Sequence, residues 1–222
     1  MTGVAALTLT RDRLDYTKHC FACLRENAGH PYDHYILDQG STDGTQEWLR
    51  NEYDADWIDL RPDNIGISKG LNDLLDAAGP HYDYYLKFDN DCEVTHPDTL
   101  KTTLAVAEGG DWMLSPRVLG LRSPPPHDDP ILVSGHKVGA LPQIGGIFLL
   151  IPGRVIRAGF RYDETNPSWG MDDVQICHWF REQGGHVGYL LDVTVNHYET
   201  TDGQWERYPD YFAQKIREGL PA

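Results

Sequence analysis

Short apolar runs alternate with segments of helical periodicity over about the first ninety residues. Apolar runs bounded by turn residues are typical of buried strands, and apolar positions three or four residues apart are typical of helices that pack on a sheet. The expected strands are Val4–Leu9, Asp33–Leu37, Trp57–Leu60 and Tyr82–Phe88, and the expected helices are Leu14–Asn27, Thr45–Tyr53 and Ile67–Ala77. This alternation predicts an α/β fold in which helices flank a mainly parallel, Rossmann-like sheet.

The second half of the chain has a less regular pattern. Residues Leu121–Pro130 contain a run of prolines and predict a surface loop. The expected helices are Pro97–Ala107, a short helix from Pro152, and Asp172–Gln183; the expected strands are Trp112–Ser115, Gly145–Ile151, His186–Leu191 and Val193–Val195. The tail predicts one amphipathic helix, Gln204–Glu218, whose packed side carries Trp205, Tyr208, Tyr211 and Phe212.

Polar residues follow the expected strands at each strand-to-helix corner. They are Asp12, Asp38, Asn64, Asp89 and Asp91. Ligands of open α/β sheets bind beyond the carboxyl ends of the strands, so these side chains are candidates for one binding site. Asp89 and Asp91 are separated by one residue and offer the hard oxygen ligands that suit Mg²⁺ or Mn²⁺. Taken alone, the acidic pair also fits a simple turn, because Asp and Asn are ordinary turn residues.

Charge and composition narrow the possible functions. The formal net charge of −15 opposes broad binding to nucleic acid or to anionic membranes, because such surfaces need basic patches. The 222 residues, 40% of them hydrophobic, are enough for one substantial core. No dinucleotide-binding or P-loop glycine pattern is present. The longest apolar run, Ile144–Pro152, is far too short to span a bilayer, and no signal peptide is recognisable.

Four cysteines include one C-x-x-C pair, Cys20 and Cys23. A structural zinc site needs four well-spaced ligands, and no second pair is present. We therefore expect reduced thiols and a cytoplasmic protein. The cysteines are Cys20, Cys23, Cys92 and Cys177.

Five motifs follow one another along the chain. They are Thr10-Arg11-Asp12-Arg13, Asp38-Gln39-Gly40-Ser41-Thr42-Asp43-Gly44-Thr45, Asn64-Ile65-Gly66-Ile67-Ser68-Lys69-Gly70-Leu71-Asn72, Asp89-Asn90-Asp91 and Trp169-Gly170-Met171-Asp172-Asp173. In this order and spacing the chain resembles the family 2 glycosyltransferases of the GT-A fold, over roughly Val4–Tyr198. The resemblance implies a nucleotide-sugar donor, Mn²⁺ or Mg²⁺ as cofactor, and transfer of a hexosyl or N-acetylhexosaminyl group.

The resemblance also implies which residues bind the donor. Asp38 matches a carboxylate that contacts the nucleobase, and an acceptor-only group suits the imide N–H of uracil, which favours a UDP-sugar. The other donor-binding candidates are Thr10, Arg11 and Arg13 in the first corner, Asn64, Gly66 and Lys69 beside the base and phosphates, Asp89 at the ribose, and Asn90 in the turn.

In the second half, Asp173 matches the family's catalytic base, which takes the proton from an acceptor hydroxyl during an inverting displacement. Asp172 stands where a Glu is more usual, so it is a second catalytic candidate. Trp169 and Gly170 are acceptor-binding candidates. Asp91 and His197 are the metal-ligand candidates, and a retaining reaction could use the same metal and donor corners.

The resemblance implies a single GT-A domain over residues 1–222. It consists of a donor-binding half (1–95), a smaller acceptor-side and catalytic half (96–200) and a C-terminal helix (201–222). The acceptor stays open among a saccharide, a lipid-linked glycan, a protein and a modified nucleobase. Two other functions are compatible with the pattern: a sugar-phosphate nucleotidyltransferase and an inactive nucleotide-sugar-binding module.

Overall fold

The computed structural model describes residues 1–121, 129–165 and 171–217. The strands are β1 Val4–Thr10, β2 Asp33–Gln39, β3 Trp57–Arg61, β4 Tyr84–Phe88, β5 Cys92–Glu93, β6 Trp112–Leu119, β7 Ile131–Val133, β8 His136–Ala140, β9 Phe148–Pro152 and β10 His186–His197. The helices are α1 Leu14–Asn27, α2 Thr45–Asn51, α3 Ile67–Ala78, α4 Thr99–Glu108, α5 Gly153–Arg157, α6 Met171–Glu182, α7 Thr200–Arg207 and α8 Pro209–Arg217.

The strands of the described residues form one mixed sheet in the order β3-β2-β1-β4-β9-β6-β10-β8-β7, with β5 paired to β10. The first four strands are parallel, as the alternating pattern predicts. Beyond β4 the sheet changes, because β9 is antiparallel to both β4 and β6, and β10 then runs parallel to β6. The α/β prediction is confirmed, and the second half contributes the antiparallel strands.

The order in which strands are added to the sheet changes sides at β1. Strands β2 and β3 lie on one side of β1, and β4 lies on the other. Such a switch opens a crevice at the carboxyl ends of the two central strands, where α/β proteins bind ligands. The first corner, which begins after Thr10, and the acidic turn, which begins after Phe88, both lie at this end of the sheet.

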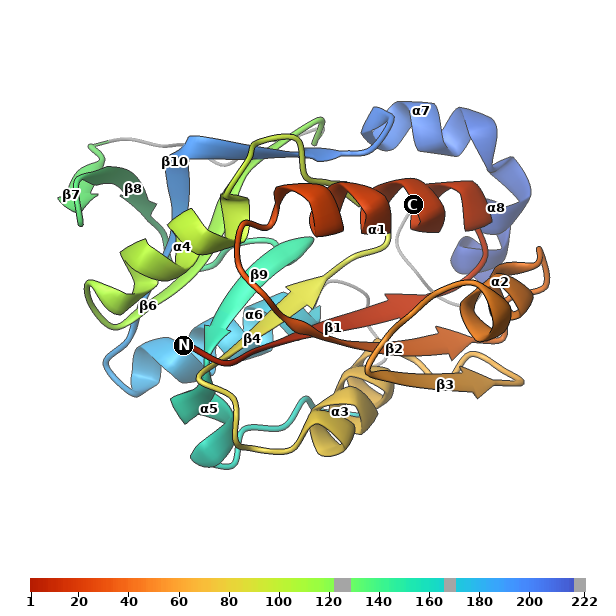
Figure 1. The fold of residues 1–222 in the computed structure, drawn as a ribbon, viewed down its shortest axis with the longest axis horizontal. Coiled ribbons are helices and arrows are strands. Elements are labelled where there is room, and N and C mark those ends of the chain that lie inside the picture. The colour runs from red at the N-terminus through yellow and green to blue at the C-terminus, as the bar shows by residue number, and fades with distance from the viewer. Residues whose placement is uncertain (122–128, 166–170, 218–222) are drawn as a thin grey trace.

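Helices cover both faces of the sheet (Figure 1). Helices α1, α2 and α4 lie over one face, and α3, α5 and α6 lie over the other. Helices α7 and α8 lie near the carboxyl ends of β1 and β2. The C-terminal helices therefore lie at the same end of the sheet as the switch crevice.

The core sits between α1 and the central strands. Phe88 of β4 pairs with Phe148 of β9, and the ring of Phe21 from α1 lies 6.4 Å from the Phe88 ring. All three side chains are fully buried. Burying a side chain of this size contributes about 1.5–3 kcal/mol, so these contacts hold the strand that leads into the acidic turn firmly in place.

The tail differs from its prediction. The sequence predicts one helix over Gln204–Glu218, but the structure has two, α7 and α8, that meet at Tyr208 and Pro209. The break has a simple cause: proline lacks a backbone N–H and is tolerated only in the first turn of a helix. The aromatic side chains do pack together, since the rings of Trp205 and Phe212 stack 4.6 Å apart.

Three further details differ from the pattern-based expectations. Strand β10 runs without interruption from His186 to His197, with a register shift between Leu190 and Thr194 against β6. The short strand β5 and the β7–β8 hairpin were not expected. Most of the expected loop Leu121–Pro130 lies outside the described residues. Within the described ranges, no helix is both long and apolar enough to cross a membrane.

Candidate active site

Asp38, at the end of β2, is the centre of the first corner. Its carboxylate accepts hydrogen bonds from Thr10 Oγ1 (2.8 Å), the Ser41 backbone N–H (2.9 Å) and Gln46 Nε2 (2.7 Å), as well as from the Ser41 hydroxyl. The side chain is fully buried. Thr10 and Asp38 are also partners across the β1–β2 ladder. Asp38 therefore ties the ends of β1 and β2 together.

The corner after β1 has an unusual backbone. Asp12 and Arg13 both have positive φ values, 51° and 59°, a conformation that costs a non-glycine residue about 1–3 kcal/mol. Side chains of the Asp38–Thr45 motif hold it: the Ser41 hydroxyl accepts from the Asp12 N–H, and Asp43 accepts from the N–H of Leu14. The half-buried Arg11 belongs to the same corner.

The loop from Asn64 to Lys69 lies at the neighbouring corner, after β3. Asn64 Oδ1 accepts from the Gly66 N–H at 3.0 Å, and Gly66 has a φ of 87°, which favours glycine. Lys69 Nζ lies 3.0 Å from Asp73 Oδ1, one helical turn further along α3. The Lys69 side chain is 45% exposed, so its ion pair with Asp73 lies at the surface and contributes little to stability.

The acidic turn has two sides. Asn90 and Asp91 face α1: Arg13 donates to Asn90 Oδ1 and to Asp91 Oδ2, both at 3.0 Å. The Asn90 amide also donates to Thr17 Oγ1 at 2.9 Å. Asp89 faces the other way, toward Lys87 and α6. Arg13 and Asn90 are thus engaged inside the protein and hold the turn, whereas Asp89 remains partly exposed.

The two metal-ligand candidates, Asp91 and His197, do come together. His197 Nε2 lies 3.6 Å from Asp91 Oδ2, although the two residues are far apart in sequence. Ligand atoms bound at 2.0–2.2 Å to one octahedral ion lie about 3 Å apart, so a small shift would let both bind the same cation. A carboxylate oxygen and an imidazole nitrogen are suitable ligands for Mn²⁺. The pair fits a divalent metal, with Asp91 shared between that metal and Arg13.

Gln204 of α7 supports this pair from behind. Its side chain is buried, and its amide nitrogen lies 3.2 Å from His197 Nδ1 and donates to the Tyr198 carbonyl at 2.8 Å. Its oxygen accepts from Arg13 Nη1 at 2.9 Å. Gln204 thus fixes Arg13, which holds Asp91, and it also fixes the ring of His197, so it is a functional candidate that the sequence did not reveal.

Asp172 and Asp173, at the start of α6, meet β4 around one lysine. Lys87 Nζ lies 3.1 Å from Asp172 Oδ2, 3.2 Å from Asp173 Oδ1 and 3.5 Å from Asp89 Oδ1. The second oxygen of Asp173 accepts from the Gly146 N–H at 2.9 Å. The catalytic candidates and the ribose candidate are therefore brought together by a residue that the sequence pattern did not mark.

The two neighbouring carboxylates have different ionisation properties. Burial raises the pKa of Asp173 to about 7, and the charge of Asp172 adds to this effect against the pull of Lys87. Burial also disfavours the ionised form of Asp172, but there Lys87 outweighs it and holds the pKa below its ordinary value. Of the two, Asp173 has the pKa that suits a general base near neutral pH.

Two candidates cannot be placed. Trp169 and Gly170 lie outside the described residues. Gly146, like Lys87, was missed by sequence reasoning, although the pair Gly145-Gly146 before a buried strand was a visible signal. A Cβ atom on Gly146 would lie 2.0 Å from Asp173 Oδ1, so only glycine fits beside this carboxylate.

A second polar cluster links α1 to β5. His19 Nε2 lies 2.7 Å from Glu93 Oε1 and 3.6 Å from Cys23 Sγ, and Asn196 donates to the other Glu93 oxygen. Nitrogen and oxygen ligands of one tetrahedral zinc ion lie about 3.3 Å apart, so the shorter His19–Glu93 contact is that of a direct hydrogen bond. We interpret the cluster as a polar link that fixes the strand after Asp91. All four cysteines are free thiols, as expected.

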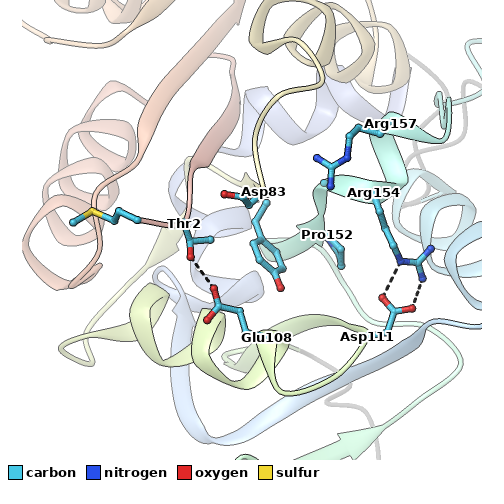
Figure 2. Close-up of a pocket in the computed structure, with 10 residues that line it drawn as sticks. Thr2, Asp83, Glu108, Asp111, Pro152, Arg154 and Arg157 are labelled. Atoms are coloured by element: carbon cyan, nitrogen blue, oxygen red, sulfur yellow. Dashed lines mark hydrogen bonds and ion pairs between the residues drawn. The ribbon is translucent and has the colours of Figure 1, made fainter.

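The surface hollow in Figure 2 lies away from these residues. Its volume is about 480 Å³, and its lining includes Thr2, Asp83, Glu108 and Arg154. Thr2 lies two residues before β1 and Asp83 one residue before β4, so the hollow is at the end of the sheet opposite the acidic turn. None of the donor, metal or catalytic candidates lines it.

Comparisons with known proteins give the fold. No family model and no curated protein sequence matches the chain. Solved structures do match. S. aureus TarS has a TM-score of 0.65 at 15% identity over 97% of this chain. The mannosyltransferase PcManGT from Pyrobaculum calidifontis, in complex with GDP-Man and Mn²⁺, has 0.67 at 16% identity over 96%. GalNAc-T7 with UDP, GalNAc and Mn²⁺ has 0.70 at 11% identity over 91%.

The chain spans less than two thirds of each of these structures: 40% of TarS, 64% of PcManGT and 45% of GalNAc-T7. The similarity nevertheless covers 91–97% of this chain. The protein described here has the GT-A fold of nucleotide-sugar-dependent glycosyltransferases.

Proposed function

We propose that this protein is a metal-dependent glycosyltransferase that moves a sugar from a nucleotide-sugar to an acceptor hydroxyl. One observation carries the proposal: Asp173 is a carboxylate with a near-neutral pKa, and Lys87 links it to Asp89 in the acidic turn. The same turn contains Asp91, which lies close to His197. A base and a site for a charged leaving group must be neighbours in a direct displacement. Similar structures carry UDP-GlcNAc, or GDP-Man and Mn²⁺.

The donor would occupy the crevice at the switch point. Thr10, Arg11 and Asp38 would meet the nucleoside, with the imide N–H of uracil taking the place of one of the four internal donors to Asp38. An acceptor-only carboxylate favours this imide and hence a UDP-sugar. Asn64, Gly66 and Lys69 would line the base and phosphates, and the partly exposed Asp89 would meet the ribose. Arg13 and Asn90 would hold the turn from inside instead of touching the donor, because their polar groups bind Asp91 and Thr17.

Asp173 would act as the base. It accepts the proton of the acceptor hydroxyl as that oxygen attacks the anomeric carbon, which inverts the configuration. Because a base must be ionised, the rate should rise with pH through about 7. Asp91 and His197 would hold the cation, which, when bound, neutralises charge on the nucleoside diphosphate. Asp172, with its lowered pKa, would remain an anion throughout.

A thermal-shift panel tests the donor half directly. We expect UDP and UDP-sugars with Mn²⁺ to raise the unfolding midpoint, because ligands that bind only the folded state stabilise it. GDP- and dTDP-sugars with Mn²⁺, and every nucleotide without metal, serve as controls. If no nucleotide shifts the midpoint in the presence of metal, the proposal is wrong. A larger shift with GDP-sugars would keep the transferase and change the donor.

A further inference from the structure

Lys87 occupies an unusual position for a lysine. It lies on the central strand β4 between Leu86 and Phe88, both fully buried, and is itself only 6% exposed. Lysine is almost never buried unless its charge is paired, since an unpaired ammonium group is very costly to remove from water. An apolar residue would pack more simply at this place, so the lysine requires an explanation in the site.

The ammonium group of Lys87 joins both halves of the site. Besides the carboxylates of Asp89, Asp172 and Asp173, it donates to the Gly146 carbonyl at 3.2 Å. Asp89 belongs to the turn after β4, whereas Asp172 and Asp173 belong to α6. An ammonium group offers three N–H donors, and here they are directed at groups from three separate segments.

Lys87 is the cation in the set of titratable groups around Asp173. That set contains Lys87 on β4, Asp89 in the following turn, Asp172 and Cys177 on α6, Tyr162, and Tyr189 on β10. Burial raises the pKa of both tyrosines and of the cysteine, so they stay neutral. Although burial opposes the charged form of Lys87, its three carboxylates hold its pKa well above the ordinary value.

We propose that Lys87 is a positioning residue for sugar transfer, whose ammonium group fixes the Asp173 carboxylate relative to Asp89 and keeps it able to accept a proton. This inference rests on the proposed function. Without Lys87, the two carboxylates at the start of α6 would repel each other, and Asp173 would keep the Gly146 N–H as a donor. When Asp173 takes the acceptor's proton, Lys87 remains paired with Asp172 and Asp89.

Lys87→Met and Lys87→Arg test this role by the pH dependence of kcat for nucleoside diphosphate release. Lys87→Met is of similar length but has no charge. We expect its kcat to fall about tenfold or more at pH 7, and the acid limb of its profile to move upward by about one to three pH units. Lys87→Arg should keep the wild-type limb. An unmoved acid limb in Lys87→Met would overturn the inference.

The double variant Lys87→Met with Asp172→Asn separates positioning from charge balance, and covers the case in which Lys87→Met alone does not fold. It removes one cation and one anion, so the net charge of the cluster is that of the wild type. We expect it to remain slower than Asp172→Asn alone. Recovery to the Asp172→Asn rate would show that Lys87 merely neutralises Asp172. A wild type that releases no nucleoside diphosphate would overturn the proposed function and this inference with it.

Discussion

Asp172 and Asp173 show how one residue's position decides its chemistry. The two carboxylates are adjacent in sequence and both touch Lys87, yet their pKa values move in opposite directions. Pairs of titratable groups whose environments separate their pKa values are typical of acid–base sites. At the residue scale this separation, more than the acidic motif itself, supports our proposal that Asp173 is the base.

Gly146→Ala should disable the site while Gly145→Ala does not. A Cβ on Gly146 would overlap Asp173 Oδ1 and crowd Lys87 Nζ, whereas a Cβ on Gly145 meets the Tyr189 hydroxyl at an ordinary 3.5 Å. Displacing a catalytic group by about 1 Å can cost about 10²-fold in rate, so we expect a loss of that order in Gly146→Ala. Steady-state kcat measures it, and nucleotide binding should persist. Equal activity of the two alanine variants would contradict the geometry.

Sequence patterns predict some of these residues and not others. Asp91 and His197 were paired by resemblance, and the structure brings them within 3.6 Å. Lys87 was missed because a lysine in a short strand usually points to solvent, and only the tertiary arrangement shows its partners. Gln204 was missed because its main partner, Arg13, is distant in sequence, and a glutamine in a tail helix does not by itself indicate a binding partner.

At the scale of elements, apolar periodicity predicts the strands and helices of the first half closely. β1, β2, β3 and α3 lie within a residue or two of their expected bounds. The second half was harder, because short strands such as β5 depend on pairing with β10 and carry little pattern of their own. The tail was predicted as one helix because its aromatic spacing is helical. Pro209 instead begins a second helix, and the prediction did not take this proline into account.

Helix α7 should affect metal binding through Gln204. In Gln204→Leu, a residue of similar size loses the contacts with Arg13, His197 and the Tyr198 carbonyl. We expect Mn²⁺-dependent nucleotide binding to weaken about tenfold or more, in the range typical for partners of metal ligands. Calorimetric titration of UDP at fixed Mn²⁺ measures this.

Glu206→Gln is the matched control, because Glu206 is exposed on the same helix. It should bind as the wild type does. If Gln204→Leu also binds normally and remains folded, His197 does not depend on α7 for its orientation.

At the scale of the whole molecule, the change from parallel to antiparallel strands positions the site. β4 pairs with β1 on one side and with β9 on the other. The corners after β1 and β2 therefore lie on one side of the acidic turn, and Gly146, just before β9, lies on the other.

The most direct test of sugar transfer with Asp173 as base compares wild type with Asp173→Asn. Nucleoside diphosphate release from a UDP-sugar panel with Mn²⁺ is measured at pH 8 in the presence of candidate acceptors, and nucleotide binding is measured in parallel. We expect turnover by the wild type, and in Asp173→Asn a loss of about 10²–10⁴-fold with nucleotide binding retained. Wild-type turnover in Asp173→Asn, or release of pyrophosphate from UTP in place of sugar transfer, would contradict the account.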